Sequence, residues 1–407
     1  MNVSAEAARR FLVARHFLGP ARSLRGGPKG VLEVFRRLGS VQFDPIDVAG
    51  RSHDLVLHAR VADYDPALCE RLYKRREIFE AYNKGLSLVP TGELPWFRGT
   101  VSLRSRALLD EHRDVADRVV ERIRADGPLS ALDFEREQGT ATDWFGMPTN
   151  VVRAVLEAAS VVGILGLERR DGNRRYYDLI ERLVPADVLA QKVRLPEQVR
   201  YRLLSRYRAH GLLGIDGGGS GIFSGLGAAK PDPRFPGSPG RTALREQLID
   251  EGELVPVEVE GVRGKRFVLR DDVGLLEAPP EPPPTVAFLP PFDALVWDRP
   301  LLASLFGFEY VWELFHPPAK RRWGWYVLPI VFGDRFVGRI EPRIDRGDGL
   351  VRILGLWWEG GFAPRRADGF VDAMRDALGA YLRFARADRL EWPSELNADR
   401  RLFGVTP

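Results

Sequence analysis

The sequence of 407 residues contains one cysteine, three methionines and six histidines. The single cysteine, Cys69, cannot form an internal disulfide bond, and the histidines show no pair at metal-ligand spacing supported by a second cluster. We therefore expect no metal, no cofactor and a reducing, cytoplasmic location. No apolar run approaches the roughly 20 residues of a membrane-spanning helix. The basic stretch at 9–18 lacks a cleavage site, so we expect no targeting peptide.

A strong excess of one charge sign is also absent. Lysine and arginine number 60 against 56 aspartates and glutamates, a net charge of +4. This excess is too small by itself to indicate a polyanionic partner. With 44% hydrophobic and 29% charged residues, the composition is typical of a soluble globular protein, and the length predicts two to four domains.

Helical periodicity and short hairpins dominate the first 278 residues. Between 106 and 190, helical spacing over Val115–Ile123, Leu129–Phe134 and Thr149–Val162 precedes a basic hairpin, which is the winged-helix pattern. A related order follows, with helices over 196–210 and 241–251 and strands over 254–259 and 266–269. The N-terminal helices, at 5–16, 30–38, 51–60 and 66–73, are interpreted as a more divergent first copy.

Beyond the proline-rich segment Glu277–Pro284, which we expect to be a stiff linker, the period changes to two. This pattern predicts a four-stranded meander and a closing helix at 310–315, 325–332, 335–344, 350–358 and 367–385. The predicted fold class is α+β, with tandem winged-helix (helix-turn-helix) units and a β-rich C-terminal part. The predicted domains are 1–105, which holds the candidate catalytic strand, 106–190, 191–278 and 285–407.

The segment Val41–Pro45 carries two polar side chains on an apolar background. Side chains alternate in an extended chain, and Pro45 disfavours helical backbone at Asp44. Gln42 and Asp44 then share one face, while Val41 and Phe43 are buried on the other. Such a carboxylate beside an amide can activate a water molecule and stabilise a developing cation. Alternatively, Asp44 caps a helix that begins at Pro45.

Basic residues interleave with aromatic residues in the β-rich part, which suits phosphate contact and base stacking. A solvated sheet face is the alternative interpretation. The candidate DNA-binding residues are Lys320, Arg321, Arg322, Trp323, Arg335 and Arg339, together with Arg169, Arg170, Arg174 and Arg175 in the hairpin of the 106–190 part.

Two other features are less specific. His53-Asp54 offers an acid/base pair near the Gln42 strand, although a structural role for the histidine is the alternative. The run Gly217–Gly221 follows no apolar strand and precedes no Gly-Lys-Ser/Thr, so it predicts a flexible loop and not the phosphate site of a nucleotide-binding enzyme.

With these residues in view, the chain resembles the YcaQ/AlkZ family of winged-helix DNA glycosylases, which unhook interstrand crosslinks. The resemblance rests on the order and spacing of short motifs along nearly the whole chain: Gln42-Phe43-Asp44, Arg51-Ser52-His53, Phe79-Glu80, Leu88-Val89-Pro90, Pro291-Phe292-Asp293, Val296-Trp297-Asp298-Arg299, Leu305–Tyr310 and Lys320–Pro329. It implies tandem winged helices around a concave basic surface for duplex DNA.

In that family the catalytic motif is glutamine, an apolar residue, and then glutamine or aspartate. Gln42-Phe43-Asp44 matches the aspartate form of the YcaQ-like branch, which implies that Gln42 and Asp44 are catalytic and that His53 and Glu80 support them. The family often has a histidine where Lys84 stands. The implied function is hydrolysis of N7-alkylated purines and crosslinks in double-stranded DNA by a monofunctional, monomeric enzyme associated with a prokaryotic nucleoid.

The competing hypothesis is a non-catalytic winged-helix transcription regulator, which would share the basic hairpins. A polar pair on an apolar-backed strand, which regulation does not require, favours the enzyme.

Overall fold

The computed structural model describes residues 1–98, 103–134, 139–142, 146–216, 221–231, 237 and 239–404. The chain forms two compact units. Unit 1 comprises 1–69, 205–223 and 247–407, and unit 2 comprises 70–204 and 224–246. Three of the four unit boundaries fall within helices, namely α4 (Pro66–Lys74), α11 (Leu195–His210) and α12 (Arg241–Asp250).

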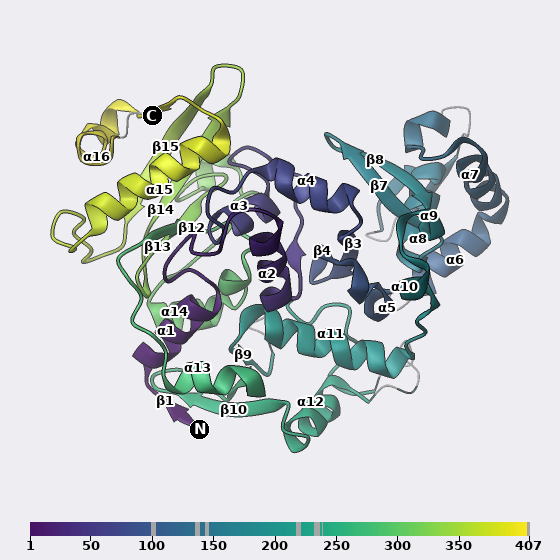
Figure 1. The fold of residues 1–407 in the computed structure, drawn as a ribbon, viewed down its shortest axis with the longest axis horizontal. Coiled ribbons are helices and arrows are strands. Elements are labelled where there is room, and N and C mark those ends of the chain that lie inside the picture. The colour runs from purple at the N-terminus through teal and green to yellow at the C-terminus, as the bar shows by residue number, and fades with distance from the viewer. Residues whose placement is uncertain are drawn as a thin grey trace. The chain divides into compact units, whose positions relative to one another are not determined.

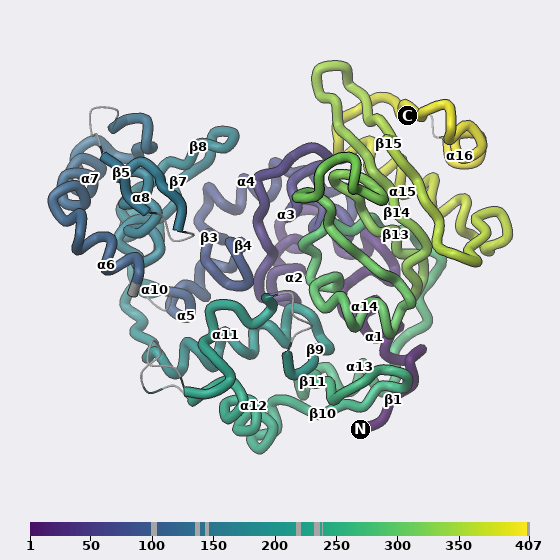
Figure 2. Tube along the Cα trace, turned by 180° about the vertical axis from the view of Figure 1, so that it is seen from behind, coloured from purple at the N-terminus to yellow at the C-terminus, as the bar shows by residue number. Residues whose placement is uncertain are grey.

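Unit 1 contains two β-sheets. The first has the order β1-β10-β11-β9 and comprises β1 (Asn2–Val3), β9 (Leu213–Gly214), β10 (Leu254–Val259) and β11 (Arg266–Leu269). β10 and β11 form an antiparallel hairpin, and the N-terminal strand β1 runs parallel to β10, beside it in both views (Figures 1 and 2).

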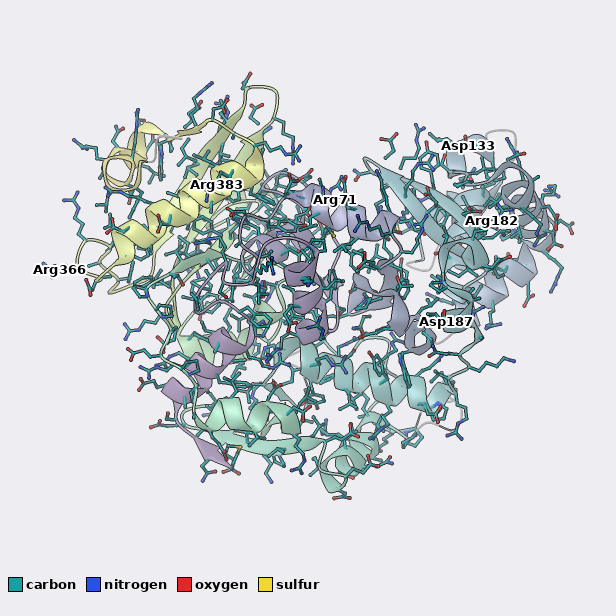
Figure 3. All side chains as sticks on the ribbon, viewed as in Figure 1. Arg71, Asp133, Arg182, Asp187, Arg366 and Arg383 are labelled. Carbon is teal, nitrogen blue, oxygen red and sulfur yellow. The ribbon has the colours of Figure 1, made fainter. Side chains whose placement is uncertain are left out.

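The second sheet has the order β12-β13-β14-β15-β16. Its strands are β12 (Val286–Phe288), β13 (Leu328–Phe332), β14 (Arg335–Asp345), β15 (Leu350–Trp358) and β16 (Arg389–Glu391). Neighbours are antiparallel except for β16, which is parallel to β15. Helix α15 (Phe370–Ala385) packs along the sheet, and its exposed side includes Arg383 (Figures 1 and 3).

The other elements of unit 1 are short helices and one two-residue strand. They are α1 (Ala5–Arg15), α2 (Pro28–Leu38), β2 (Val41–Gln42), α3 (Ser52–His58), η4 (Arg270–Asp272), α13 (Val273–Glu277), η5 (Ala294–Val296), α14 (Arg299–Phe306), η6 (Pro318–Lys320), η7 (Ser394–Leu396) and α16 (Asn397–Phe403). One apolar core of unit 1 is shared by α1, α13, η5, α14 and both sheets.

Unit 2 consists of short helices and hairpins. Its elements are β3 (Ile78–Asn83), β4 (Gly85–Pro90), η1 (Thr91–Glu93), α5 (Leu94–Phe97), α6 (Leu103–Glu111), α7 (Arg113–Asp126), η2 (Ala131–Phe134), β5 (Thr140–Thr142), β6 (Pro148–Asn150), α8 (Val151–Val162), β7 (Leu165–Asp171), β8 (Arg174–Leu179), α9 (Ile180–Leu183) and α10 (Ala186–Ala190).

Helix α8 lies at the centre of unit 2. The Asn150 side chain caps it by accepting hydrogen bonds from the backbone N–H groups of Val152 and Arg153, and Gly163 ends it in a left-handed conformation. Its apolar face packs against α7 and the β7–β8 hairpin. The helices expected over 115–123 and 149–162 and the hairpin after them are therefore observed.

The α+β class is confirmed, and so are most of the predicted elements, but two predictions are wrong. The described residues 307–317 contain no strand, although 310–315 was expected to be one. The predicted helix at 129–134 is only the single turn η2, where Asp133 accepts hydrogen bonds from the backbone and hydroxyl of Ser130. Residues 217–220 of the glycine run lie outside the described residues.

The segment Glu277–Pro284 lies inside unit 1. The division into four consecutive domains remains a prediction. In the part of the chain that the structure describes, every helix is too short or too polar to span a bilayer.

Candidate active site

The segment around β2 has the alternation that the sequence predicts. Val41 and Phe43 are buried, and Gln42 and Asp44 are half-buried between them. The two polar side chains therefore share the partly exposed face of the segment.

Asp44 does not cap a helix. The described residues 43–51 contain no helix, and the next one, α3, begins only at Ser52. The backbone N–H of Ile46 instead donates a hydrogen bond to Asp44 Oδ1 at 2.9 Å, across Pro45. This local turn fixes the carboxylate at the end of β2, and the helix-cap interpretation is wrong.

Asp44 accepts this one hydrogen bond from the described residues, through Oδ1. Burial raises the pKa of the Asp44 carboxyl, and the Ile46 N–H counteracts part of that effect. A carboxylate that is partly withdrawn from water and keeps one oxygen for another partner is a suitable base for a bound water molecule.

The charge of Asp44 acts on Tyr326. Burial, followed by the negative charge of Asp44, raises the pKa of the Tyr326 hydroxyl well above its usual value. The side chain is 1% exposed, and its hydroxyl has no hydrogen-bond partner among the described residues. The sequence reasoning missed Tyr326, because nothing in the local pattern connects the start of β13 with β2.

His53 supports the strand from its buried side. The rings of His53 and Phe43 are stacked, with centroids 4.9 Å apart. Because Phe43 points away from the face of Gln42 and Asp44, this contact favours a positioning role for His53 over direct proton transfer.

Behind His53 lies a buried polar cluster. The Tyr64 hydroxyl donates to Asp54 Oδ1 at 2.6 Å and also interacts with Cys69, and His53 Nε2 lies 3.5 Å from Asp54 Oδ2. Among the described residues, His53, Asp54 and Cys69 form a group whose donor atoms lie within 4.8 Å of one another and could hold a metal ion. Two of these three residues, Asp54 and Cys69, already interact with the Tyr64 hydroxyl.

Two buried glutamates hold the loop that precedes β13. The Glu313 carboxylate accepts hydrogen bonds from the backbone N–H groups of Arg322, Trp323 and Gly324 at 2.8, 2.8 and 3.2 Å. Glu341 accepts those of Trp325 and Tyr326 at 2.6 and 3.0 Å. Burial acts to raise the pKa of Glu313, but the three N–H groups outweigh it and lower the pKa. Neither glutamate was predicted from the sequence.

The candidate DNA-binding residues of the β-rich part occupy different environments. Lys320, Arg322 and Arg335 are exposed, and Arg321 and Trp323 are half-buried. Arg339 is 3% exposed; it pairs with Glu359 and donates to the carbonyl oxygen of Glu309.

The Arg339 guanidinium lies 4.2 and 4.3 Å from the ring centroids of Phe308 and Trp323. Arg339 therefore supports Trp323 from inside the protein. β14 shifts register against β13 between its pairs at Phe336 and Gly338, so the simple alternation is broken and its arginines do not share one environment.

Unit 2 holds the other candidates. Arg170 pairs with both carboxylate oxygens of Glu80, at 2.7 and 2.8 Å. Arg169 pairs with Glu168 and Arg175 pairs with Glu157, whereas Arg174 is exposed and donates to the Tyr176 hydroxyl. Glu80 is therefore held in an ion pair within unit 2. The other three predicted active-site residues, Gln42, Asp44 and His53, belong to unit 1.

The family model of AlkZ-like DNA glycosylases matches residues 35–384 of the chain. The chain belongs to the AlkZ-like DNA glycosylase family. It is therefore a glycosylase, a hydrolase whose substrate is DNA. This membership supports the enzyme over the non-catalytic regulator.

The fold is that of a solved AlkZ-like protein. The structure of the DNA glycosylase AlkZ from Streptomyces sahachiroi superposes with a TM-score of 0.60 at 20% identity, and the match covers 97% of this chain and 100% of that one. The matched region of the AlkZ-like family includes Gln42, Asp44 and Tyr326.

The Asp54 carboxyl makes stability depend on pH. Burial raises its pKa from 3.8 to about 7, although the Tyr64 hydrogen bond and the charge of Arg51 counteract it. The folded protein then holds a proton that the unfolded chain releases between these values. Stability from this group is present at low pH and is lost as pH rises toward 7 and above, by about 1.4 kcal/mol per pKa unit at most.

We expect Asp54→Asn to remove this dependence, because asparagine keeps the oxygen that accepts from Tyr64 but does not titrate. The difference between the melting temperatures at pH 5 and pH 8 should be smaller in the variant than in the parent protein. Asp348→Asn, at an exposed carboxylate, is the matched control and should leave the difference unchanged. An equal difference in all three proteins would contradict the assignment.

Proposed function

We propose that this enzyme hydrolyses the N-glycosidic bond of N7-alkylated purines in duplex DNA and also unhooks interstrand crosslinks made through purine N7. Asp44 activates the attacking water molecule, and Gln42 holds that water or the deoxyribose. The observation that carries this proposal is the half-buried Asp44 carboxylate, held beside Gln42 on the open face of an apolar-backed strand.

The chemistry of the substrate matches this simple set of residues. Alkylation at N7 makes the purine a cationic leaving group, so its departure needs little help from a general acid. The remaining requirements are a positioned water molecule and a negative charge near the sugar as it acquires oxocarbenium character. Asp44 supplies both.

A crosslinked base is covalently tied to the opposite strand. Full rotation of the nucleotide into a deep pocket, as in base flipping, is therefore obstructed. A carboxylate on an open strand suits such a substrate better. We propose water, and not a lysine amine, as the nucleophile, which makes the enzyme monofunctional.

The loop that carries Lys320, Arg321 and Arg322 is our proposed phosphate contact in unit 1. The exposed Lys320 and Arg322 and the half-buried Arg321 neutralise phosphates, and the carboxylates of Glu313 and Glu341 hold the backbone of the loop in place. Because Arg339 is buried and paired, we assign it to support of Trp323 and not to a phosphate.

Replacement of Asp44 by asparagine tests the catalytic assignment. Asparagine keeps the shape and can still accept from the Ile46 N–H, but it lacks the negative charge and the basic oxygen. We expect Asp44→Asn to lower the single-turnover rate of excision of N7-methylguanine by about 10² or more. Duplex affinity and melting temperature should be retained.

Asp47→Asn is the matched control, because this carboxylate lies on the same segment but forms a surface ion pair with Arg346. It should excise at the parental rate. Full activity of Asp44→Asn would refute the role of Asp44, and equal losses in both variants would point to a general disturbance of the segment.

Charge reversal tests the phosphate contact. The double variant Arg321→Glu/Arg322→Glu should bind any duplex more weakly, and the slope of log affinity against log salt should decrease by about 2, because each lost phosphate contact releases about one counterion fewer. Arg365→Glu/Arg366→Glu is the control pair, exposed on another loop of unit 1, where Arg366 is labelled in Figure 3. If the first pair leaves affinity and slope unchanged, the loop is not part of the DNA-binding surface.

A further inference from the structure

Phe315 is a large apolar side chain that lies in solvent and not in the core of unit 1. Of the large hydrophobic side chains that the structure describes, it is the most exposed, at 84%. It lies just before an exposed run that continues to Lys320. We propose that Phe315 is a wedge that enters the DNA duplex beside the lesion and separates stacked bases there. This inference rests on the DNA substrate and on the catalytic position proposed for Asp44.

The turn that carries Phe315 is held in shape from within the protein. Glu313, two residues earlier, is buried, and its carboxylate accepts the backbone N–H groups of residues 322–324. The backbone carbonyl oxygen of Glu313 accepts a hydrogen bond from the backbone N–H of His316 at 2.9 Å. The Arg321 side chain donates one, through Nε, to the backbone carbonyl oxygen of His316 at 2.9 Å. A ring on a fixed turn loses little conformational freedom when it binds.

The surroundings of Phe315 are suited to a nucleic acid. The same loop continues with Lys320, Arg321 and Arg322, so the exposed ring and the phosphate-binding cations lie on one short segment. An apolar partner protein would be a poor match for this cluster of like charges, whereas a duplex offers phosphates outside and stacked bases inside.

A row of aromatic rings connects Phe315 to Tyr326. The Phe315 ring contacts Trp312 edge to face, with centroids 5.8 Å apart, and Trp312 contacts Tyr326 at 6.3 Å. Tyr326 is the residue whose hydroxyl is influenced by the charge of Asp44. The exposed ring is therefore on the same unit as Asp44 and two aromatic contacts away from Tyr326.

A wedge meets a specific need of this reaction. The glycosidic carbon of a stacked nucleotide is shielded, and a crosslinked base cannot swing out completely. Insertion of an apolar side chain partly unstacks a base step and bends the duplex, and the contacts of the inserted side chain offset the lost stacking. This partial opening lets Asp44 reach the sugar without full base flipping.

The test uses 2-aminopurine, whose fluorescence rises when it is unstacked. A duplex carries it next to an N7-methylguanine whose sugar is 2′-fluorinated, so that the base cannot leave during the measurement. We expect the full-length protein to raise the fluorescence and Phe315→Ala to bind this duplex without that rise. On the ordinary lesion, Phe315→Ala should slow single-turnover excision about tenfold, because the unstacking cost is no longer compensated.

Three controls make the result specific. Leu354→Ala removes an apolar side chain that is 49% exposed on β15 and should behave as the parent protein does. Phe315→Leu keeps an apolar wedge and should retain part of the fluorescence rise. On a single-stranded substrate, which has no duplex to open, Phe315→Ala should excise at the parental rate.

The wedge is refuted if Phe315→Ala raises the fluorescence and excises from duplex as the parent protein does. It is also refuted if the variant slows excision equally from single and double strands. If the parent protein raises the fluorescence, Phe315→Ala does not, and neither protein releases N7-methylguanine, then the wedge is supported and the proposed substrate is wrong.

Discussion

A fully buried ion pair between Arg60 and Asp293 determines how unit 1 is assembled. The two guanidinium nitrogens lie 2.7 and 3.0 Å from the Asp293 carboxylate oxygens, and Arg60 also donates to the carbonyl oxygens of His16 and Val56. These bonds join the end of α1, helix α3 and the segment before η5. Loss of either charge would leave the other buried without compensation, which is strongly destabilising.

The position of α3 matters because its first turn carries His53. With α3 held by Arg60 through Val56, the His53 ring lies against Phe43 and keeps the β2 segment in place. Three carboxylates of unit 1 have two different environments. Glu313 and Glu341 are occupied by backbone N–H groups and shape the loop, whereas Asp44 accepts a single such bond and retains capacity for water.

The sequence allowed much of the fold to be predicted wherever local patterns decide it. The β10–β11 hairpin was predicted with its observed bounds because alternation and a glycine turn define it. The strand expected at 310–315 fails for a tertiary reason. The buried Tyr310 donates a hydrogen bond to the carbonyl oxygen of Val327, and the buried Glu313 accepts hydrogen bonds from backbone N–H groups. These side-chain contacts, and not strand pairing, account for the alternating burial that suggested a strand.

The candidate site shows the same limit. Alternation predicted that Gln42 and Asp44 share a face, and the resemblance to glycosylases drew attention to them. Tyr326 and Glu341 reach the site only through the tertiary fold, and Arg339 is buried against Glu359 and Trp323, contacts that no local pattern indicates.

The most direct test of this account is product analysis with a duplex that carries a single N7-methylguanine. After incubation with the protein, the account predicts free N7-methylguanine in solution and, in equal amount, an abasic site that alkali converts to a strand break. No borohydride-trapped protein–DNA adduct should form. Recovery of the intact lesion, with the duplex bound but not hydrolysed, would contradict the central claim.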